Sequence, residues 1–205
     1  MATKTRAYSS TRRQAQAAQT RTDVLQAAVT LFSERGWKGT TLAAIAERAG
    51  VAIETVYSGF GSKKALLLAA VDVAVVGDAE PIPLFDRPEA RDLAKGPRVE
   101  RIRKGVALNA QVAERVGPMW RAALEAAAGD ADIAKWIDEK ERARRLDDGR
   151  ALELIFDRPP TDEELDLIWV LYGNEVYLKL HDTGWSRAKY EEHLFTLTKR
   201  IFGVR

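Results

Sequence analysis

The chain has 205 residues, of which 46% are hydrophobic, so it can bury a core and general disorder is excluded. It has no cysteine, which excludes disulfides, thiolate metal sites and cysteine nucleophiles and is consistent with a cytoplasmic location. The net charge of +2 is uneven: residues 1–70 hold ten Lys/Arg against four Asp/Glu, whereas residues 71–205 hold 22 against 26. A polyanionic partner is therefore expected for the first part alone, unless its basic residues are simply a solvated tail.

Residues 1–15 are predicted to be a basic, flexible arm, because four basic residues lie among Ser, Thr and Ala without an acid. Residues 1–22 contain no apolar segment of a signal peptide. A helical pattern begins near Gln16 and is expected to end at Gly36. Its apolar stripe consists of Val24, Leu25, Ala28, Leu31 and Phe32.

Three short helices are predicted after Gly36. Thr41 is expected to cap the first, and Gly50 supplies the left-handed turn that follows it. The second runs from about Ala52 to Phe60 with Val56 and Phe60 pointing inward, and the third runs from Lys63 towards Val76 behind the cap Ser62. The apolar stretch in this last helix is interrupted by Asp72 and is far shorter than the roughly 20 residues of a membrane span, so no membrane association is expected.

The first two of these short helices have the spacing of a helix-turn-helix. Counted from Leu42, the fifth position is the small residue Ala46, where two helices cross closely. The ninth is Gly50 in the tight turn, and the fifteenth is the apolar anchor Val56. A helix-turn-helix places its second helix in the major groove of DNA. The spacing therefore predicts a DNA-binding function.

Only helices are predicted beyond a proline-rich loop at residues 80–88. We expect breaks at Gly117-Pro118, Gly129-Asp130, Pro159-Pro160 and Thr183-Gly184. No strand pattern and no internal repeat occurs, so the fold class is all-α, with a domain at residues 16–70 and a second at residues 71–205. The expected helices are Arg98–Val116, Pro118–Ala128, Ala131–Phe156, Asp162–Asp182 and Ser186–Phe202.

Residues 24–72, VLQAAVTLF through LLLAAVD, resemble the N-terminal helix-turn-helix domain of TetR-family transcriptional regulators. The resemblance covers about 50 residues, and Ala52 and Lys64 depart from it, since a capping Ser and an acidic residue are common there. The remaining residues match the family only in being helical. The matching features are Ala27-Ala28, Leu31-Phe32, Gly36, Thr40-Thr41, Ile45-Ala46, Ala49-Gly50-Val51, Thr55-Val56-Tyr57, Phe60, Lys63 and Leu66-Leu67.

The resemblance implies that the helix after Gly50 enters the major groove and that its flanks bind phosphates. The phosphate contacts it implies are Thr41, Thr55, Tyr57 and Lys63, and the base contacts are Ile53, Glu54, Ser58 and Gly59. Ile53 suits a thymine methyl group and Glu54 a cytosine amino group.

Each of these roles has a structural alternative. Tyr57 is otherwise a half-buried core aromatic, Ile53 packs against the preceding helix, and Glu54 merely favours a helix N-terminus. Further phosphate or minor-groove contacts are expected from Arg12, Arg13 and Arg21, although residues 1–11 are equally well explained as a disordered tail.

A dimer is expected, because one helix-turn-helix reads few base pairs and two copies can read a pseudo-palindromic operator. The last two helices are predicted to form the homodimer interface, since the helix at residues 162–182 is apolar around much of its circumference. By resemblance, these helices form a four-helix bundle between subunits.

By the same resemblance, the middle helices enclose a pocket for an unidentified small-molecule effector. Met119 is expected as a further wall residue. The alternative is that these side chains are ordinary core residues or are solvated. The residues expected to line the pocket are Asn109, Trp120, Arg121, Leu124, Trp136, Asn174 and Glu175.

No enzymatic motif occurs, the two histidines have no metal-ligand spacing, and no cofactor is expected. The sequence therefore predicts a dimeric, ligand-responsive repressor of transcription. The alternatives are a constitutive or activating regulator without ligand control, a recombinase-type enzyme, for which no acid cluster or activated serine is found, and a helical interaction protein that does not bind DNA.

Overall fold

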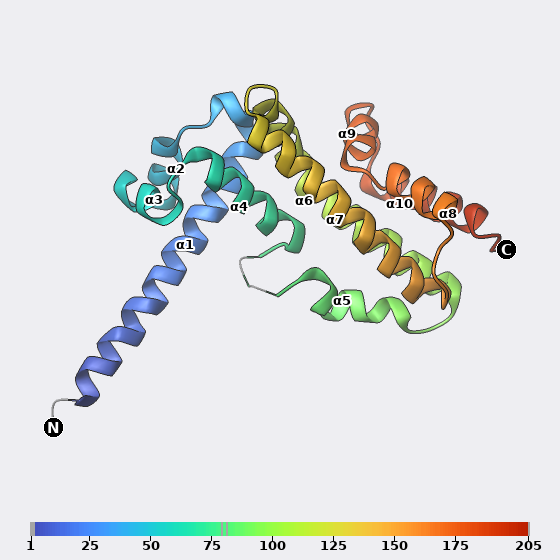
Figure 1. Cartoon of the computed structure of the whole chain (residues 1–205), viewed down its shortest axis with the longest axis horizontal. Coiled ribbons are helices and arrows are strands. Elements are labelled where there is room, and N and C mark those ends of the chain that lie inside the picture. Colours follow the sequence, from blue (N-terminus) through green and yellow to red (C-terminus); the bar gives the residue numbers. More distant parts are fainter. Residues whose placement is uncertain (1–2, 79, 81, 205) are drawn as a thin grey trace.

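The structure, a computed structural model, describes residues 3–78, 80 and 82–204, with side chains described from residue 13 onward. Every regular element in these ranges is a helix, which confirms the predicted all-α fold class (Figure 1). None of the described helices combines the length and the apolar character needed to cross a membrane.

Helix α1 spans Thr3–Gly39 and begins earlier than predicted. The segment at residues 3–15 is helical rather than irregular, because no glycine or proline precedes Gly36 to stop the helix. Residues 13–19 are exposed, and Val24, Ala28 and Phe32 are buried. Gly36 has a φ of 67° and ψ of −172°, so the helix is kinked where its end is expected.

Helices α2 (Leu42–Ala49), α3 (Ile53–Phe60) and α4 (Lys63–Val76) follow the predicted boundaries closely. The side chains of Thr41 and Ser62 accept hydrogen bonds from the third residues after them, Ala44 and Ala65, and so cap α2 and α4 as expected. The proline-rich loop contains η1 (Leu84–Asp86) and leads through α5 (Pro88–Arg91) to η2 (Asp92–Ala94).

Helix α6 is continuous over Arg98–Ala127, so the break predicted at Gly117-Pro118 is wrong. A β-carbon at Gly117 would lie 3.3 Å from the Tyr177 ring and 3.2 Å from Leu178, so this glycine permits the close approach of a neighbouring helix. Pro118 lies inside α6 and is followed by the buried residues Met119 and Trp120. Tertiary packing therefore overrides the local signal for a helix end.

Helix α7 spans Ala131–Phe156 as predicted and lies along α6 (Figure 1). The single helix predicted at residues 162–182 is instead two, α8 (Asp162–Leu171) and α9 (Asn174–Asp182), with Gly173 between them. At that break, the backbone crowds the glycine: a β-carbon there would lie 3.2 Å from the Val170 carbonyl oxygen. Helix α10 (Arg187–Ile201) completes the chain behind its cap Ser186.

Two hydrophobic cores hold these helices together. The first joins α1–α4 to the C-terminal half of α6 and the start of α7. The second joins η2, the N-terminal half of α6 and the end of α7 to α8–α10. The long α6–α7 pair therefore belongs to both cores and connects the two ends of the molecule. The domain boundary near residue 70 stays a prediction.

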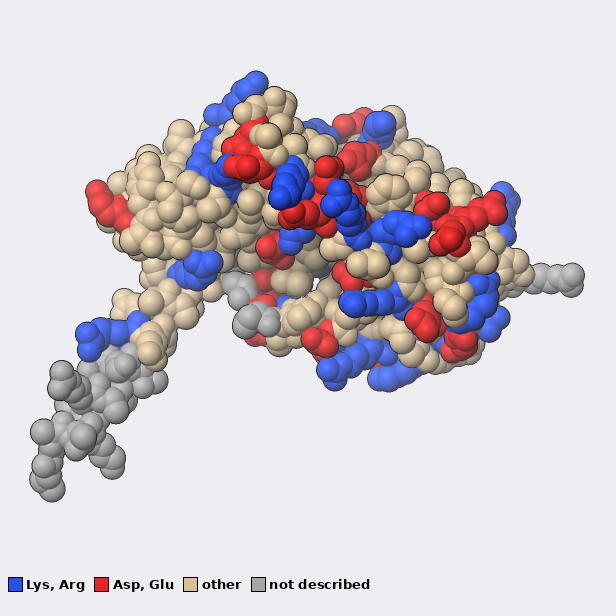
Figure 2. Space-filling model, viewed as in Figure 1, with Lys and Arg blue, Asp and Glu red and all other residues tan. Residues whose placement is uncertain are grey.

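Charge is distributed unevenly over the face drawn in Figure 2. Acidic and basic side chains alternate over the C-terminal helices, whereas the surface over α2 and α3 carries few charges. Glu54 is the one charged residue within α3. Helix α3 itself therefore offers no positive charge to a polyanion.

Candidate functional site

The turn between α2 and α3 depends on Gly50. Its φ of 67° and ψ of 31° are left-handed, a conformation that a β-carbon disfavours. The Gly50 N–H donates to Glu47 and the Val51 N–H donates to Ala46, so the last carbonyls of α2 are satisfied within the turn. This fixed turn sets the direction in which α3 leaves α2.

One face of α3 is anchored and the other is exposed. Val56 is fully buried and packs in the first core, together with Ala46 and Ile45. On the opposite side, Glu54, Tyr57 and Ser58 are exposed, and Tyr57 keeps 52% of its surface accessible. Tyr57 thus belongs to neither hydrophobic core, and its contact with a phosphate stays a prediction.

Ile53 and Thr55 are partly buried. Ile53 packs against the first core, as its structural alternative expects, and a contact with a thymine methyl group stays a prediction for its exposed part. Thr41 is exposed, but its hydroxyl already accepts from the Ala44 N–H at 3.1 Å. The hydroxyl hydrogen of Thr41 can still be donated to a phosphate.

Arg21 links α1 to the end of α3. Its Nη1 donates to the Gly59 carbonyl oxygen at 3.1 Å, and its guanidinium lies 4.4 Å from the centre of the Phe60 ring. A cation at these carbonyls also complements the negative end of the α3 dipole. Arg13 lies beside it in a groove between α1 and α3, and the side chain of Arg12 lies outside the described residues.

Lys63 is directed inward rather than towards a partner. Its Nζ donates to the Trp37 carbonyl and lies 4.1 Å from the centre of the Trp37 ring. Burial lowers the pKa of the Lys63 ammonium, and Glu125 opposes this shift. Lys63 thus ties the start of α4 to the end of α1, and its phosphate contact stays a prediction.

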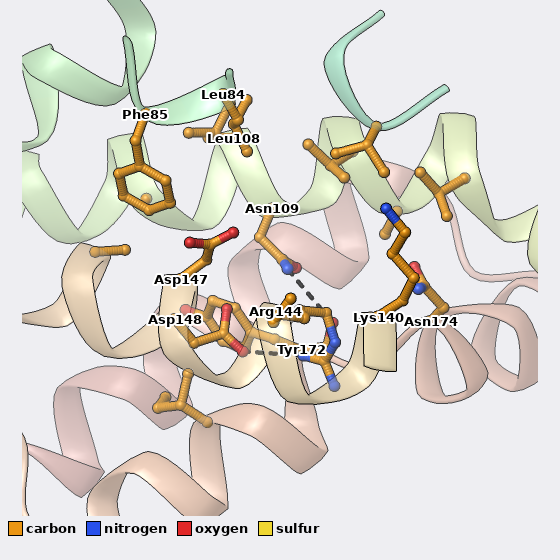
Figure 3. A pocket seen from close by; sticks show the side chains of 18 of the residues that line it. Leu84, Phe85, Leu108, Asn109, Lys140, Arg144, Asp147, Asp148, Tyr172 and Asn174 are labelled. Carbon is orange, nitrogen blue, oxygen red and sulfur yellow. Dashed lines mark hydrogen bonds and ion pairs between the residues drawn. The ribbon is translucent and has the colours of Figure 1, made fainter. Parts of the chain in front are cut away.

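A second candidate site is a cavity of about 360 Å³ between α4, η1, α6, α7 and the C-terminal helices (Figure 3). Of the residues predicted to line a pocket, Asn109, Trp120 and Asn174 do so. Asn109 and Trp120 lie on one face of the continuous helix α6, and Asn174 is the first residue of α9. Met119 is fully buried in the first core.

The other four predicted residues do not line the cavity. Arg121 pairs with Asp182 at 2.8 Å on the surface, and Leu124 is 38% exposed, because both lie on another face of α6. Trp136 packs against Trp120 with 6.4 Å between ring centres. Glu175 is outside the cavity and accepts a hydrogen bond from the Trp120 indole N–H at 3.0 Å.

Sequence reasoning missed the charged residues that α7 contributes to the cavity. They recur at i, i+1, i+4, i+7 and i+8, the spacing of one helix face. Such a stripe of charges is normally the solvated side of a helix, so it gave no sign of a cavity. These residues are Lys140, Glu141, Arg144, Asp147 and Asp148.

Arg144 is the centre of this charged stripe. Its guanidinium lies 2.7 Å from Glu141 and 3.0 Å from Asp148, and it also donates to the Trp169 carbonyl oxygen at 3.0 Å. Burial nevertheless raises the pKa of the Asp148 carboxyl to about 7, with Arg144 acting in the opposite direction. Burial also raises the pKa of Asp147.

Two amides add polar groups to the cavity wall. The Asn109 amide nitrogen donates to the Tyr172 carbonyl oxygen at 3.4 Å, and its own oxygen is buried without a hydrogen-bond partner among the described residues. Asn174 is only 8% exposed. The Tyr172 hydroxyl is 2.8 Å from that of Thr198, and burial raises the pKa of Tyr172.

Helix α4 connects the cavity with the helix-turn-helix. Its residues Val71, Asp72 and Val75 line the cavity, while Leu66 and Leu67 are fully buried in the first core. Its end is held by α6, because the Arg115 guanidinium donates to the last carbonyl oxygens of α4 at 3.0 Å. Helix α4 therefore belongs both to the wall of the cavity and to the core that holds α3.

Further contacts join the end of α1 and the start of α4 to the end of α6 and the start of α7. A carboxylate oxygen of Glu125 accepts from the Trp37 N–H at 2.7 Å. Lys64 lies 3.0 Å from Asp130 and 2.8 Å from Asp132, at the start of α7.

Residues 24–70 match the model of the family described as bacterial regulatory proteins, tetR family. No curated protein sequence matches the chain. The family match spans α2 and α3 and most of α4, which are the elements that build the exposed face around Tyr57.

Solved structures share the fold over most of this chain. A Rhodococcus sp. protein assigned to the TetR-family transcriptional regulators has a TM-score of 0.65 at 16% identity, covering 89% of this chain and 98% of that one. A TetR-like transcriptional regulator from Rhodococcus sp. RHA1 has a TM-score of 0.56 at 21% identity, covering 91% and 97%. The TetR-like transcriptional regulator LfrR from Mycobacterium smegmatis, solved in complex with proflavine, has a TM-score of 0.56 at 18% identity, covering 91% and 96%. All three are named as transcriptional regulators, and their likeness to this chain is one of fold.

Proposed function

Because residues 24–70 match the family described as bacterial regulatory proteins, tetR family, we propose that the protein is a dimeric, ligand-responsive transcriptional repressor. It binds a pseudo-palindromic operator in the cytoplasm and releases it when a small molecule occupies the C-terminal cavity. The observation that supports the proposal most directly is α4, which forms a wall of the cavity and part of the core beneath α3.

DNA binding is assigned to the exposed face of α3 and to its flanks. Glu54 and Ser58 can reach base edges, and the hydroxyl of Tyr57 can donate to a phosphate. The buried Val56 fixes the position of this face relative to α2. Because α3 carries few charges, we assign much of the attraction for DNA to basic residues of α1 such as Arg13 and Arg21.

Dimerisation is assigned to α8 and α10. Leu167 and Val170 are 44% and 56% exposed and lie three residues apart on one face of α8. Large apolar side chains grouped on a surface are typical of a protein interface. A second copy of the chain packed there would cover both residues and present two α3 helices to the same side of a duplex.

Ligand control follows from the position of α4. A ligand that fills the cavity favours the arrangement of α4 in which the cavity is widest, and it shifts the balance only by its difference in affinity for the two arrangements. The cavity of about 360 Å³ is within the size range of small-molecule sites, which favours this function over a constitutive regulator. LfrR was solved with proflavine, and we propose that a small organic molecule likewise occupies this chain.

Selection of bound fragments from the source genome tests the DNA-binding part of the proposal. We expect a short sequence with two half-sites about one helical turn apart, protected by the protein on one side of the duplex. The Tyr57→Ala variant should lose affinity for all fragments, and Leu146→Ala, at an exposed leucine of α7, is its matched surface control. Enrichment of no common sequence, or full binding by Tyr57→Ala, would contradict the assignment.

A further inference from the structure

We propose that the cavity binds a lipophilic organic cation, with the positive group of the ligand placed among Asn109, Asp147 and Asp148. This inference names the class of the effector and rests on the proposed ligand-responsive function. In Figure 3, Asp147 points into the space below Phe85 and beside Asn109, and Asp148 lies below it next to Arg144 and Tyr172.

The charged groups that line the cavity do not balance. Asp72 and Lys140 pair at 2.6 Å and neutralise each other. Arg144 forms ion pairs with two carboxylates, those of Glu141 and Asp148, which are both largely buried. The lining of the cavity therefore holds more carboxylates than cations.

Asp147 adds to this excess. Its partner Arg150 is 3.3 Å away, but the side chain of Arg150 is 68% exposed, so water competes for the pair. Arg150 is also outside the set of residues that line the cavity. A ligand in the cavity therefore meets the carboxylate of Asp147 with its charge only partly offset, because its exposed partner Arg150 lies outside the cavity.

The pKa values of the Asp147 and Asp148 carboxyl groups reflect this excess of negative charge. Burial raises the pKa values of both Asp147 and Asp148, although a neighbouring arginine lowers each of them. The remaining upward shift means that the negative charges are incompletely compensated. A cation in the cavity supplies the missing charge, whereas an anion adds to the repulsion.

One neutral polar group of the cavity wall, the Asn109 amide oxygen, is a hydrogen-bond acceptor without a donor among the described residues. The Asn109 amide nitrogen is directed to the Tyr172 carbonyl oxygen, which leaves the buried oxygen of Asn109 without a donor. Asn174 also lines the cavity and is 8% exposed, and its amide carries both donors and an acceptor. An ammonium group, which carries only donors, fits the acceptor of Asn109 and the nearby carboxylates.

The rest of the wall requires an apolar body on the ligand. Leu84, Phe85 and Leu108 lie around the space next to the acidic group, and Ile155 also lines the cavity. The described residues contain no group of three His, Cys, Asp or Glu that suits a metal ion, so a bare inorganic cation is disfavoured. An aromatic or aliphatic amine small enough for about 360 Å³ satisfies both the apolar wall and the charge.

Three probes with one aromatic body test the inference: 2-(1-naphthyl)ethylamine, 2-(1-naphthyl)ethanol and 1-naphthylacetate. Their binding to the full chain is measured by titration calorimetry. We expect the ammonium compound to bind about ten- to a hundredfold more tightly than the alcohol, with the carboxylate weakest, because a hydrogen-bonded charge is stronger than a neutral contact. Equal binding of amine and carboxylate, or binding of none of the three, would overturn the proposal.

Two variants test whether Asp147 and Asp148 cause the preference for the amine over the alcohol. Asp147→Asn and Asp148→Asn should reduce the amine-over-alcohol preference about tenfold or more and leave alcohol binding unchanged. The matched control is Asp166→Asn, because Asp166 is an exposed acid of α8 that pairs with Arg145 outside the cavity. A preference retained in both cavity variants would assign the amine to another site and refute the inference.

The same titrations separate this inference from the proposed function. If the amine is preferred but DNA affinity is unchanged by it, the cation site stands and ligand control is refuted. If the alcohol binds as well as the amine and both release DNA, ligand control stands and the cation inference is refuted.

Discussion

Replacing Asp148 with asparagine removes a buried carboxyl while keeping its shape. The Asp148 side chain is 15% exposed and has one cationic partner, Arg144, which it shares with Glu141. Tyr172, Tyr190 and Asp147 are the other titratable groups whose charges act on it or are affected by it. Burial raises its pKa from the ordinary 3.8 to about 7 in the folded chain.

The sign of the effect follows from this upward shift. Between pH 3.8 and about 7 the folded chain holds a proton that the unfolded chain has released, so stability falls as pH rises through this window. A shift of about 3 pKa units costs ~4 kcal/mol once the carboxyl is ionised in both states. Asp148→Asn carries no such cost, so it should be more stable than the parent above neutrality.

Urea denaturation followed by tryptophan fluorescence measures the difference, at one protein concentration because the chain is proposed to be a dimer. From about pH 5 to about pH 8 the free energy of unfolding of the parent should fall by ~3 kcal/mol relative to that of Asp148→Asn. Asp166→Asn is the control: Asp166 is 62% exposed and paired with Arg145, so the change should be at most ~1 kcal/mol at every pH.

Parallel stability profiles for the parent and Asp148→Asn would refute the reasoning. They would show that Arg144 keeps the carboxylate ionised throughout, and that the cavity has no uncompensated negative charge at this residue. The preference for a cation would then depend on Asp147 alone.

Three further predictions concern the rest of the molecule. Tyr57→Phe should weaken binding to all DNA sequences several-fold in mobility shifts, with an unchanged salt slope, because a hydroxyl displaces no counter-ion; unaltered affinity would contradict the phosphate contact. Gly50→Ala should lower the free energy of unfolding by ~1 kcal/mol, because Gly50 has a φ of 67° that a β-carbon disfavours. Gly59→Ala, in open space within α3, should be neutral or stabilising in the same denaturation assay, and equal effects of the two variants would argue against strain in the turn. Leu167→Glu with Val170→Glu should give a monomer in sedimentation and weak operator binding, and an intact dimer would exclude this face of α8.

The helix-turn-helix could be predicted from sequence because its determinants are local. Thr41 caps the helix that follows it, and Gly50 permits the turn beside it. Val56 lies on the buried side of α3 by helical spacing alone. Caps, turns and amphipathic spacing act over a few residues, so one sequence is enough to locate them.

Two local signals failed where packing was stronger. Gly117-Pro118 indicates a helix end, yet Gly117 is the point at which α9 approaches a continuous α6. The apolar pattern at residues 162–182 indicates one helix, yet the chain turns at Gly173 so that α9 can reach α6. In both cases the decisive partner is distant in sequence.

The sequence by itself determined the all-helical fold, the helix-turn-helix and the anchored side of α3, since each depends on neighbours within one or two helical turns. Only the tertiary structure decided that Lys63 faces Trp37 and that the charged stripe of α7 lines a cavity. The reason is physical: whether a charged side chain meets water or a buried partner depends on the helix that covers it. The raised pKa of Asp148 therefore follows from the packing of several helices around α7 and from no property of its own segment.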